Sequence, residues 1–215
     1  MLTDKYQPHS FSDIIGNAHS LSSIRRLCGE PGPLRVMFCG PKGVGKTITA
    51  KILGHSLAKN PALNMTLLNG TKCTQDWIER ILESELMMFG FDGGFRVWII
   101  DELESVTPGA AKVLRTVLRE GMRPKTAILA TTNQNKDPQG RLWNDDHLRG
   151  AIWTRFTRYQ FDAVPASEIA PYLRMIARLE NQDGKADDFY MSIAKQSGGN
   201  VADAIGLLEE SFEER

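Results

Sequence analysis

The chain carries the sequence GPKGVGKT at Gly40–Thr47. It fits the pattern G-x-x-x-x-G-K-[ST], in which glycines let backbone N–H groups curl around phosphate oxygens. The apolar run Leu34–Cys39 comes directly before it, and apolar residues at helical spacing follow over Lys46–Lys59. The sequence therefore predicts a buried strand, a phosphate-binding loop and a helix whose amino terminus adds partial positive charge.

This loop predicts that the chain binds ATP together with Mg²⁺. Lys46 is expected to reach the β- and γ-phosphates and to assist catalysis, and Thr47 is expected to hold the metal ion. A glycine-rich turn that matches by chance is the alternative, and the strand–loop–helix context argues against it. The residues expected to bind the nucleotide here are Gly40, Pro41, Gly43, Val44, Gly45, Lys46, Thr47 and Ile48.

A second apolar strand is expected over Arg96–Asp101 and ends in two carboxylates, Asp101 and Glu102. Beside a phosphate-binding loop, Asp101 can bind Mg²⁺ and Glu102 can polarise the water that attacks the γ-phosphate. The alternative is a solvated acidic turn after a strand. A glutamate next to the metal-binding aspartate suits a hydrolase better than a small-molecule kinase.

A third apolar strand is expected over Thr126–Thr131 and leads to Asn133. In a parallel sheet its carboxyl end lies at the same edge as the phosphate loop. Asn133 could therefore contact the γ-phosphate or the attacking water, and the alternative is that it only begins a loop.

Strands alternating with helices predict an α/β fold with a five-stranded, mostly parallel sheet covered on both faces. Beyond Pro165 the strand signals cease, which places an α/β domain over residues 1–164 and a small three-helix domain over residues 165–215. Further strands are expected over Asn64–Asn69 and Thr157–Phe161. Further helices are expected over Gln75–Phe89 with Trp77 on its apolar face, from Pro108 to Gly121, and over Ser167–Leu179, Asp187–Gln196 and Asn200–Glu210.

Charge is balanced over the 215 residues, with 26 Lys and Arg against 26 Asp and Glu. The chain as a whole is therefore no electrostatic nucleic-acid binder, and any such contact needs a local patch. Lys112, Arg115 and Arg119 recur at positions i, i+3 and i+7, on one face of an expected helix. This face suits a nucleic-acid backbone, and a solvated helix face is the alternative.

Three features bear on the compartment. The three cysteines are odd in number and lack metal-type spacing, which indicates reduced thiols. The opening MLTDKYQPHSF has no apolar core of a signal peptide, and no apolar run approaches the roughly 20 residues that span a bilayer. We expect a cytoplasmic protein, or a nuclear one, or one of the host cytoplasm if the source is viral, with no membrane partner.

These motifs, in this order, resemble the AAA+ superfamily, and among its members the ATPase subunits of clamp loaders of the replication factor C small-subunit and phage types. Lys5–Pro8 followed by Phe11–Gly16 is similar to the family's opening KYRP…F-x-[DE]-[VI]-[VI]-G, with Gln7 in place of arginine. Leu67–Thr71 is similar to its second strand. The resemblance implies adenine contacts from Tyr6, Pro8, Ile14 and Ile15.

The resemblance also assigns roles to Asn133, which follows the strand expected over Thr126–Thr131, and to Arg155, which precedes the last strand. Asn133 falls at the family's sensor 1 position. Ala151–Phe156 is similar to the segment A-I-x-S-R-C, whose arginine completes the site of a neighbouring subunit, and Arg155 matches that arginine finger. Arg149 and Arg158 are the alternatives for this role. A finger acting in trans implies an oligomer of AAA+ subunits, either homo- or heteromeric.

Besides Gln7, the sequence departs from the family at two further places. Ser197–Ile205 is similar to the lid segment, but Ala202 stands where the sensor 2 arginine is usual. Leu103-Glu104 replaces the common A-D or A-H after the acidic pair. The resemblance implies DNA contacts by Lys112, Arg115 and Arg119.

The function expected from the residues and the resemblance is an ATP-hydrolysing subunit of an oligomeric, DNA-associated, clamp-loader-like machine, with a sliding clamp or another protein as a further partner. The alternative is an ATP-dependent assembly switch that binds DNA or protein and recruits an effector, with slow or no hydrolysis. Ala202 favours the switch, whereas Glu102 and Arg155 favour hydrolysis.

Overall fold

A computed structural model of the chain describes all residues except 77, 80–92, 121, 134–151 and 214–215. Five strands form one sheet in the order β2-β3-β4-β1-β5, and every neighbouring pair is parallel. Most of the helix expected over Gln75–Phe89, including Trp77, and the candidate finger Arg149 lie outside the described residues. The strands are β1 (Leu34–Cys39), β2 (Met65–Asn69), β3 (Arg96–Asp101), β4 (Thr126–Thr132) and β5 (Thr157–Gln160).

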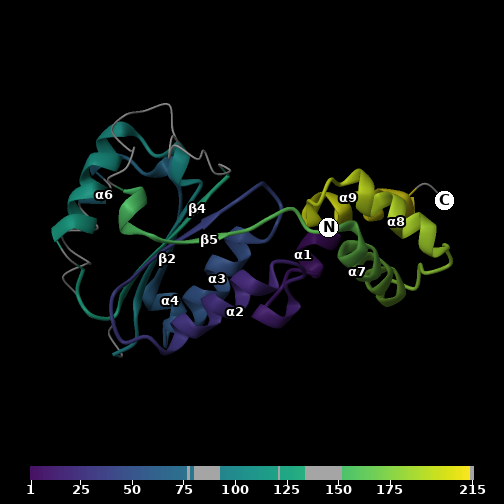
Figure 1. Cartoon of the computed structure of the whole chain (residues 1–215), viewed down its shortest axis with the longest axis horizontal. Helices are drawn as coiled ribbons and strands as arrows, with labels where there is room; N and C mark the ends of the chain where they lie inside the picture. The colour runs from purple at the N-terminus through teal and green to yellow at the C-terminus, as the bar shows by residue number, and fades with distance from the viewer. Residues whose placement is uncertain (77, 80–92, 121, 134–151, 214–215) are drawn as a thin grey trace.

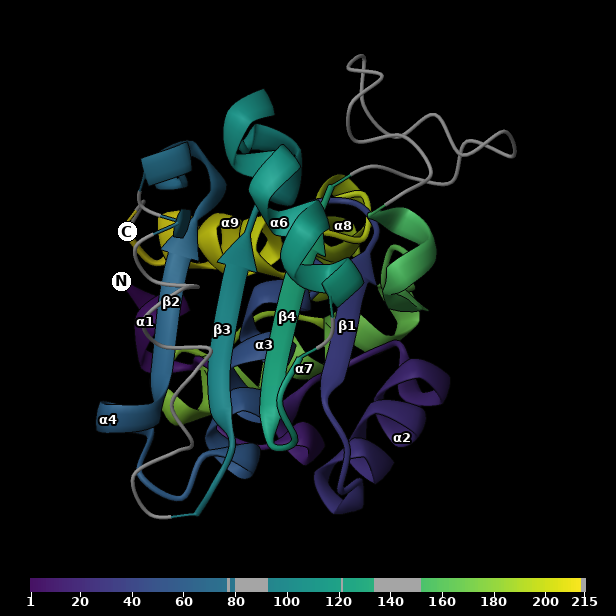
Figure 2. The same ribbon diagram turned by 90° about the vertical axis from the view of Figure 1, so that its left-hand side faces the viewer.

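The central strands are apolar throughout because both faces of the sheet are covered. Successive side chains point to opposite faces, so Val36 and Phe38 of β1 enter one core while Met37 and Cys39 enter the other. β3 and β4 divide in the same way. The first core lies under α2 (Ala18–Arg26) and α3 (Lys46–Leu57), and the second lies under α6 (Pro108–Glu120). Figure 2 shows α6 and α3 on opposite sides of the sheet.

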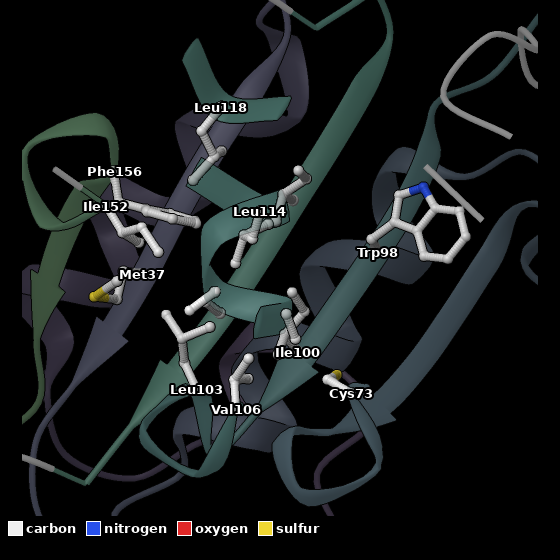
Figure 3. Packing of buried hydrophobic residues seen from close by; sticks show 14 of the residues in the cluster. Met37, Cys73, Trp98, Ile100, Leu103, Val106, Leu114, Leu118, Ile152 and Phe156 are labelled. Carbon is white, nitrogen blue, oxygen red and sulfur yellow. The ribbon is translucent and has the colours of Figure 1, made fainter. Parts of the chain in front are cut away.

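Helix α6 buries its apolar stripe and exposes its basic one. Leu114 and Leu118 are 1% and 2% exposed and pack towards Met37 and Phe156 (Figure 3). Thr107 caps the helix, because its Oγ1 accepts a hydrogen bond of 3.4 Å from the amide of Ala110. This packing leaves the basic face of Lys112, Arg115 and Arg119 on the outer side of the helix.

The last three helices pack around a core of their own. They are α7 (Ala166–Leu179), α8 (Asp187–Gln196) and α9 (Val201–Glu213), and their buried side chains include Leu173, Tyr190 and Leu208. The start of the chain joins this core through Leu2 of α1 (Leu2–Lys5), whose amide donates to Glu209 Oε1 at 2.9 Å. In Figure 1 these helices lie at one end of the molecule, beyond the sheet.

The chain also forms several short helical elements. The one-turn helix α4 (Pro61–Asn64) takes up Asn64, which was expected to begin a strand, because Pro61 occupies the first position of that helix. The 3₁₀ turns are η1 (Phe11–Asp13), η2 (Leu27–Gly29), η3 (Gly70–Lys72), η4 (Leu103–Ser105) and η5 (Trp153–Arg155). Within the described part of the chain, no helix has the length and apolarity that crossing a membrane requires.

Candidate functional site

The loop Gly40–Thr47 joins the carboxyl end of β1 to the first turn of α3. Gly43 and Gly45 have φ values of 72° and 97°, a region in which other residues are strained. A Cβ atom on Gly43 would also lie 1.6 Å from Asn200 Oδ1. Both the backbone conformation and the lack of space therefore require glycine at this position. The loop therefore presents backbone amides and the amino terminus of α3 at the edge of the sheet.

Lys46 is buried at the start of α3, with 5% of its surface exposed. Its Nζ donates to the carbonyl of Pro41 and, at 3.0 Å, to Oδ1 of Asn133. Burial lowers the pKa of Lys46, and the carboxylates of Glu104 and Asp101 oppose that shift by favouring the charged form. A buried ammonium beside a glycine loop is an arrangement that binds anions. The side chain of Asn133 belongs to it through its hydrogen bond with Lys46.

Thr47 and Asp101 meet where α3 faces the end of β3. Thr47 Oγ1 donates to Asp101 Oδ1 at 2.7 Å, and Thr131 Oγ1 donates to the same oxygen at 2.5 Å. Hydroxyl and carboxylate oxygens are the hard donors that Mg²⁺ prefers. The Thr47–Asp101 pair therefore fits the magnesium ion that the sequence predicts. The role of Thr131 as a second partner of Asp101 was not predicted.

Glu102 begins the turn after β3 in the left-handed region, with φ 56° and ψ 56°. Such a conformation in a residue other than glycine is uncommon and is concentrated at functional sites. Its amide donates to Thr131 Oγ1 at 3.0 Å, and its Oε2 accepts from Asn69 Nδ2 at 3.2 Å. Asn69, at the end of β2, thus holds the carboxylate that was predicted to polarise water.

An apolar pocket adjoins the glycine loop. The four residues that the resemblance assigned to adenine line it together with four residues of the loop and α3, although its further walls from α7 and α9 were not predicted. The predicted residues are Tyr6, Pro8, Ile14, Ile15, Gly43, Val44, Gly45 and Ile48, and the others used below are Tyr172, Val201, Ala202 and Ile205. A pocket of this kind suits a flat aromatic base.

The helical segment touches the loop directly. The amide of Val201, at the start of α9, donates to the carbonyl of Gly43 at 3.0 Å. Ala202 follows and lines the pocket with a methyl group in place of the arginine that the family pattern has there. This hydrogen bond between α9 and the loop joins backbone atoms.

Arg155 lies apart from the loop. It ends η5, which precedes β5, the edge strand of the sheet, and Thr157 pairs with Val36 near the middle of β1. Arg155 is half-buried, whereas Arg158 lies over the ring of Trp153 at 4.5 Å. Lys112, Arg115 and Arg119 are exposed on the outer face of α6.

Comparisons with known proteins bear on the family of the chain and on its fold. Residues 36–156 match the family described as "ATPase family associated with various cellular activities (AAA)". Replication factor C large subunit of Methanosarcina mazei is 28% identical over 96% of this chain and 32% of its own length. Replication factor C small subunit of Methanothermobacter thermautotrophicus is 26% identical over 97% of the chain and 62% of its own length.

Solved structures show the same fold. A point mutant of RuvB from Thermotoga maritima superposes with a TM-score of 0.73 at 22% identity over 95% of this chain and 65% of that one.

Among the sequence relatives, replication factor C subunit 5 of Mus musculus is 24% identical over 97% of this chain and 59% of its own length. The chain thus spans between about a third and three fifths of the length of these curated relatives.

Proposed function

The chain belongs to the AAA family of ATPases, and we propose that it binds ATP at the Gly40–Thr47 loop and hydrolyses it as one subunit of an oligomeric, DNA-associated machine of the clamp-loader kind. The observation that carries the proposal is the pair of carboxylates at the end of β3. Asp101 is bonded to Thr47 of the loop, and Glu102 stands next to it in a strained turn. This arrangement suits attack by water on a terminal phosphate.

Each group has one task in this reaction. Lys46 and Asn133 would hold the outer phosphate oxygens, because their side chains already share a hydrogen bond at the loop. Glu102 would take a proton from the attacking water as the bond between the γ-phosphorus and the bridging oxygen breaks, giving ADP and phosphate. Mg²⁺ held at Thr47 and Asp101 would supply positive charge to the phosphate oxygens.

The helical segment is proposed to act as a lid over the nucleotide. Its α9 lines the apolar pocket and bonds to Gly43, and its three helices pack around one core, which Leu2 at the start of the chain also joins. Residues 165–215 would then form the second domain. The base would contact both parts and so favour one relative position of them.

Arg155 is proposed to act on the nucleotide of a neighbouring subunit. It precedes an edge strand, which is a position open to a second subunit, and an arginine there would neutralise charge as the phosphate bond breaks. Other AAA+ subunits are therefore proposed as partners. We also propose that DNA binds the α6 face and that a sliding clamp is a further partner. The proposed compartment is the cytoplasm or the nucleus.

Replacing Arg155 with alanine is expected to lower steady-state turnover at least about 100-fold while the dissociation constant for ATP changes less than about threefold. The reason is that the finger stabilises charge only in the transition state. Arg158→Ala tests the alternative finger, and because that guanidinium lies over the ring of Trp153, this variant should keep wild-type turnover. Unchanged turnover in Arg155→Ala would assign the finger elsewhere.

Mixing tests whether the finger acts in trans. In a homo-oligomer, Arg155→Ala subunits keep an intact site and Glu102→Gln subunits keep an intact finger. Mixed oligomers should therefore regain turnover that neither variant has alone. Mixed oligomers that stay inactive would contradict a finger supplied by the neighbour.

The second candidate is the assembly switch, which Ala202 in the pocket wall favours.

DNA separates the two candidates. If the chain is the ATP-hydrolysing machine, a primed DNA template is expected to raise its turnover about tenfold, through contacts that weaken as salt rises. Changing Lys112, Arg115 and Arg119 together to alanine should remove this stimulation and leave the DNA-independent rate unchanged. A rate equal to that of Glu102→Gln with and without DNA would favour the switch.

A further inference from the structure

Glu104 is a third carboxylate at the end of β3, and the proposed reaction does not use it. Its Oε1 accepts a hydrogen bond of 3.0 Å from the backbone amide of Asn133. Its Oε2 is buried and has no hydrogen-bond partner among the atoms that the structure describes. A buried carboxylate oxygen without a partner carries a desolvation cost, so folding alone gives little reason for a charge at this position.

The turn that carries Glu104 is anchored in the core by the buried side chains of Leu103 and Val106. It is the short helix η4, whose Leu103 is completely buried under α6, while Val106 directly after it is 5% exposed (Figure 3). The amide of Ser105 donates to the carbonyl of Glu102 at 2.8 Å and closes the turn. Successive residues of a 3₁₀ helix point about 120° apart. With Leu103 held in the core, Glu104 is directed away from it, towards the end of β4.

At the end of β4 the contacts continue to the phosphate loop. Asn133, held at its amide by Glu104, accepts with its Oδ1 a bond of 3.0 Å from Lys46. The charge of Glu104 also favours the protonated form of Lys46 against the burial that lowers the pKa of this ammonium. Glu104 thus acts on Asn133 and Lys46, the two groups proposed to hold the terminal phosphate.

We propose that Glu104 is a positioning residue for ATP hydrolysis: its carboxylate fixes the backbone of Asn133, so that the side chains of Asn133 and Lys46 keep a single alignment towards the terminal phosphate. The proposal rests on the proposed function. A shift of the Asn133 backbone would move the side-chain amide of Asn133 away from the terminal phosphate. Small misplacements of catalytic groups lower the reaction rate strongly.

The first test compares two substitutions of Glu104. Glu104→Ala removes the acceptor of the Asn133 amide and should lower kcat about tenfold, with KM for ATP within about twofold. Glu104→Gln keeps an oxygen at the same place and should recover kcat to within about threefold of the wild type. Ser105→Ala, an exposed neighbour on the same turn, is the control and should keep wild-type kcat. A kcat in Glu104→Ala equal to that of the wild type overturns the proposal.

A double-mutant cycle tests whether Glu104 acts through Asn133. In an Asn133→Ala background the held side chain is absent, so adding Glu104→Ala should lower kcat less than about twofold further. Independent, multiplying losses would mean that Glu104 acts by another route and would overturn the proposal.

Amide hydrogen exchange of Asn133 supplies a readout that does not need turnover. The exchange should accelerate in Glu104→Ala and stay slow in Glu104→Gln and Ser105→Ala, with the thermal unfolding midpoint as a check on folding. An inactive wild-type chain would refute the proposed function. In that case the exchange alone decides, and equal Asn133 exchange in the wild type and Glu104→Ala overturns the positioning role.

Discussion

Replacing Lys46 with alanine is expected to weaken ATP binding at least about 100-fold. The Lys46 ammonium is buried at the loop, where a charge-assisted hydrogen bond contributes roughly 1.5–3 kcal/mol and is poorly replaced by water. Two such bonds to phosphate oxygens account for the expected loss, since about 1.4 kcal/mol corresponds to a factor of ten. Titration with a fluorescent ATP analogue in the presence of Mg²⁺ measures the change.

The matched control for Lys46 is Lys51 on the same helix. Lys51→Ala removes the same charge from α3 one turn further on and should leave the dissociation constant within about twofold of the wild type. A Lys46→Ala variant that is folded and binds ATP as tightly as Lys51→Ala would contradict the assignment of the phosphate site to this loop.

Replacing Glu102 with glutamine is expected to leave ATP affinity within about twofold and to lower turnover at least about 100-fold. The amide oxygen of glutamine can still accept the hydrogen bond that Asn69 donates, so the local structure should persist. The amide cannot take a proton from water. Binding and phosphate release are measured on the same preparation.

The exposed Glu30, ahead of β1, gives the control Glu30→Gln, which should turn over at the wild-type rate. Two outcomes would separate the roles of Glu102. Normal turnover in Glu102→Gln would assign the base elsewhere. A loss of ATP affinity equal to the loss of turnover would mean that this residue binds the nucleotide rather than activating water.

The sheet could be predicted largely because its strands are buried on both faces. Such strands are short apolar runs with clear ends, and for β1 and β3 the predicted bounds agree with the structure. Helix α8 was likewise predicted correctly, because acidic residues open it and a glycine pair follows it. For these elements the local pattern carries the information.

The partners of the site residues could not be predicted in the same way. Asn69 bonds Glu102 because β2 lies beside β3, and Glu104 bonds Asn133 because β3 lies beside β4. Strand order depends on long-range packing, which no local period reveals. Tyr172 in the pocket wall is a further case, since it comes from a helix far along the chain.

A single-turnover experiment shows whether the Gly40–Thr47 loop hydrolyses the ATP that it binds. The chain, in excess over labelled ATP, is mixed with Mg²⁺ and primed DNA, and bound ATP and released phosphate are followed together. Hydrolysis at the Gly40–Thr47 loop predicts that bound ATP decays to ADP and phosphate in the wild type and persists in Glu102→Gln. ATP that binds the wild type and stays intact as long as in Glu102→Gln would contradict the claim that this site hydrolyses it.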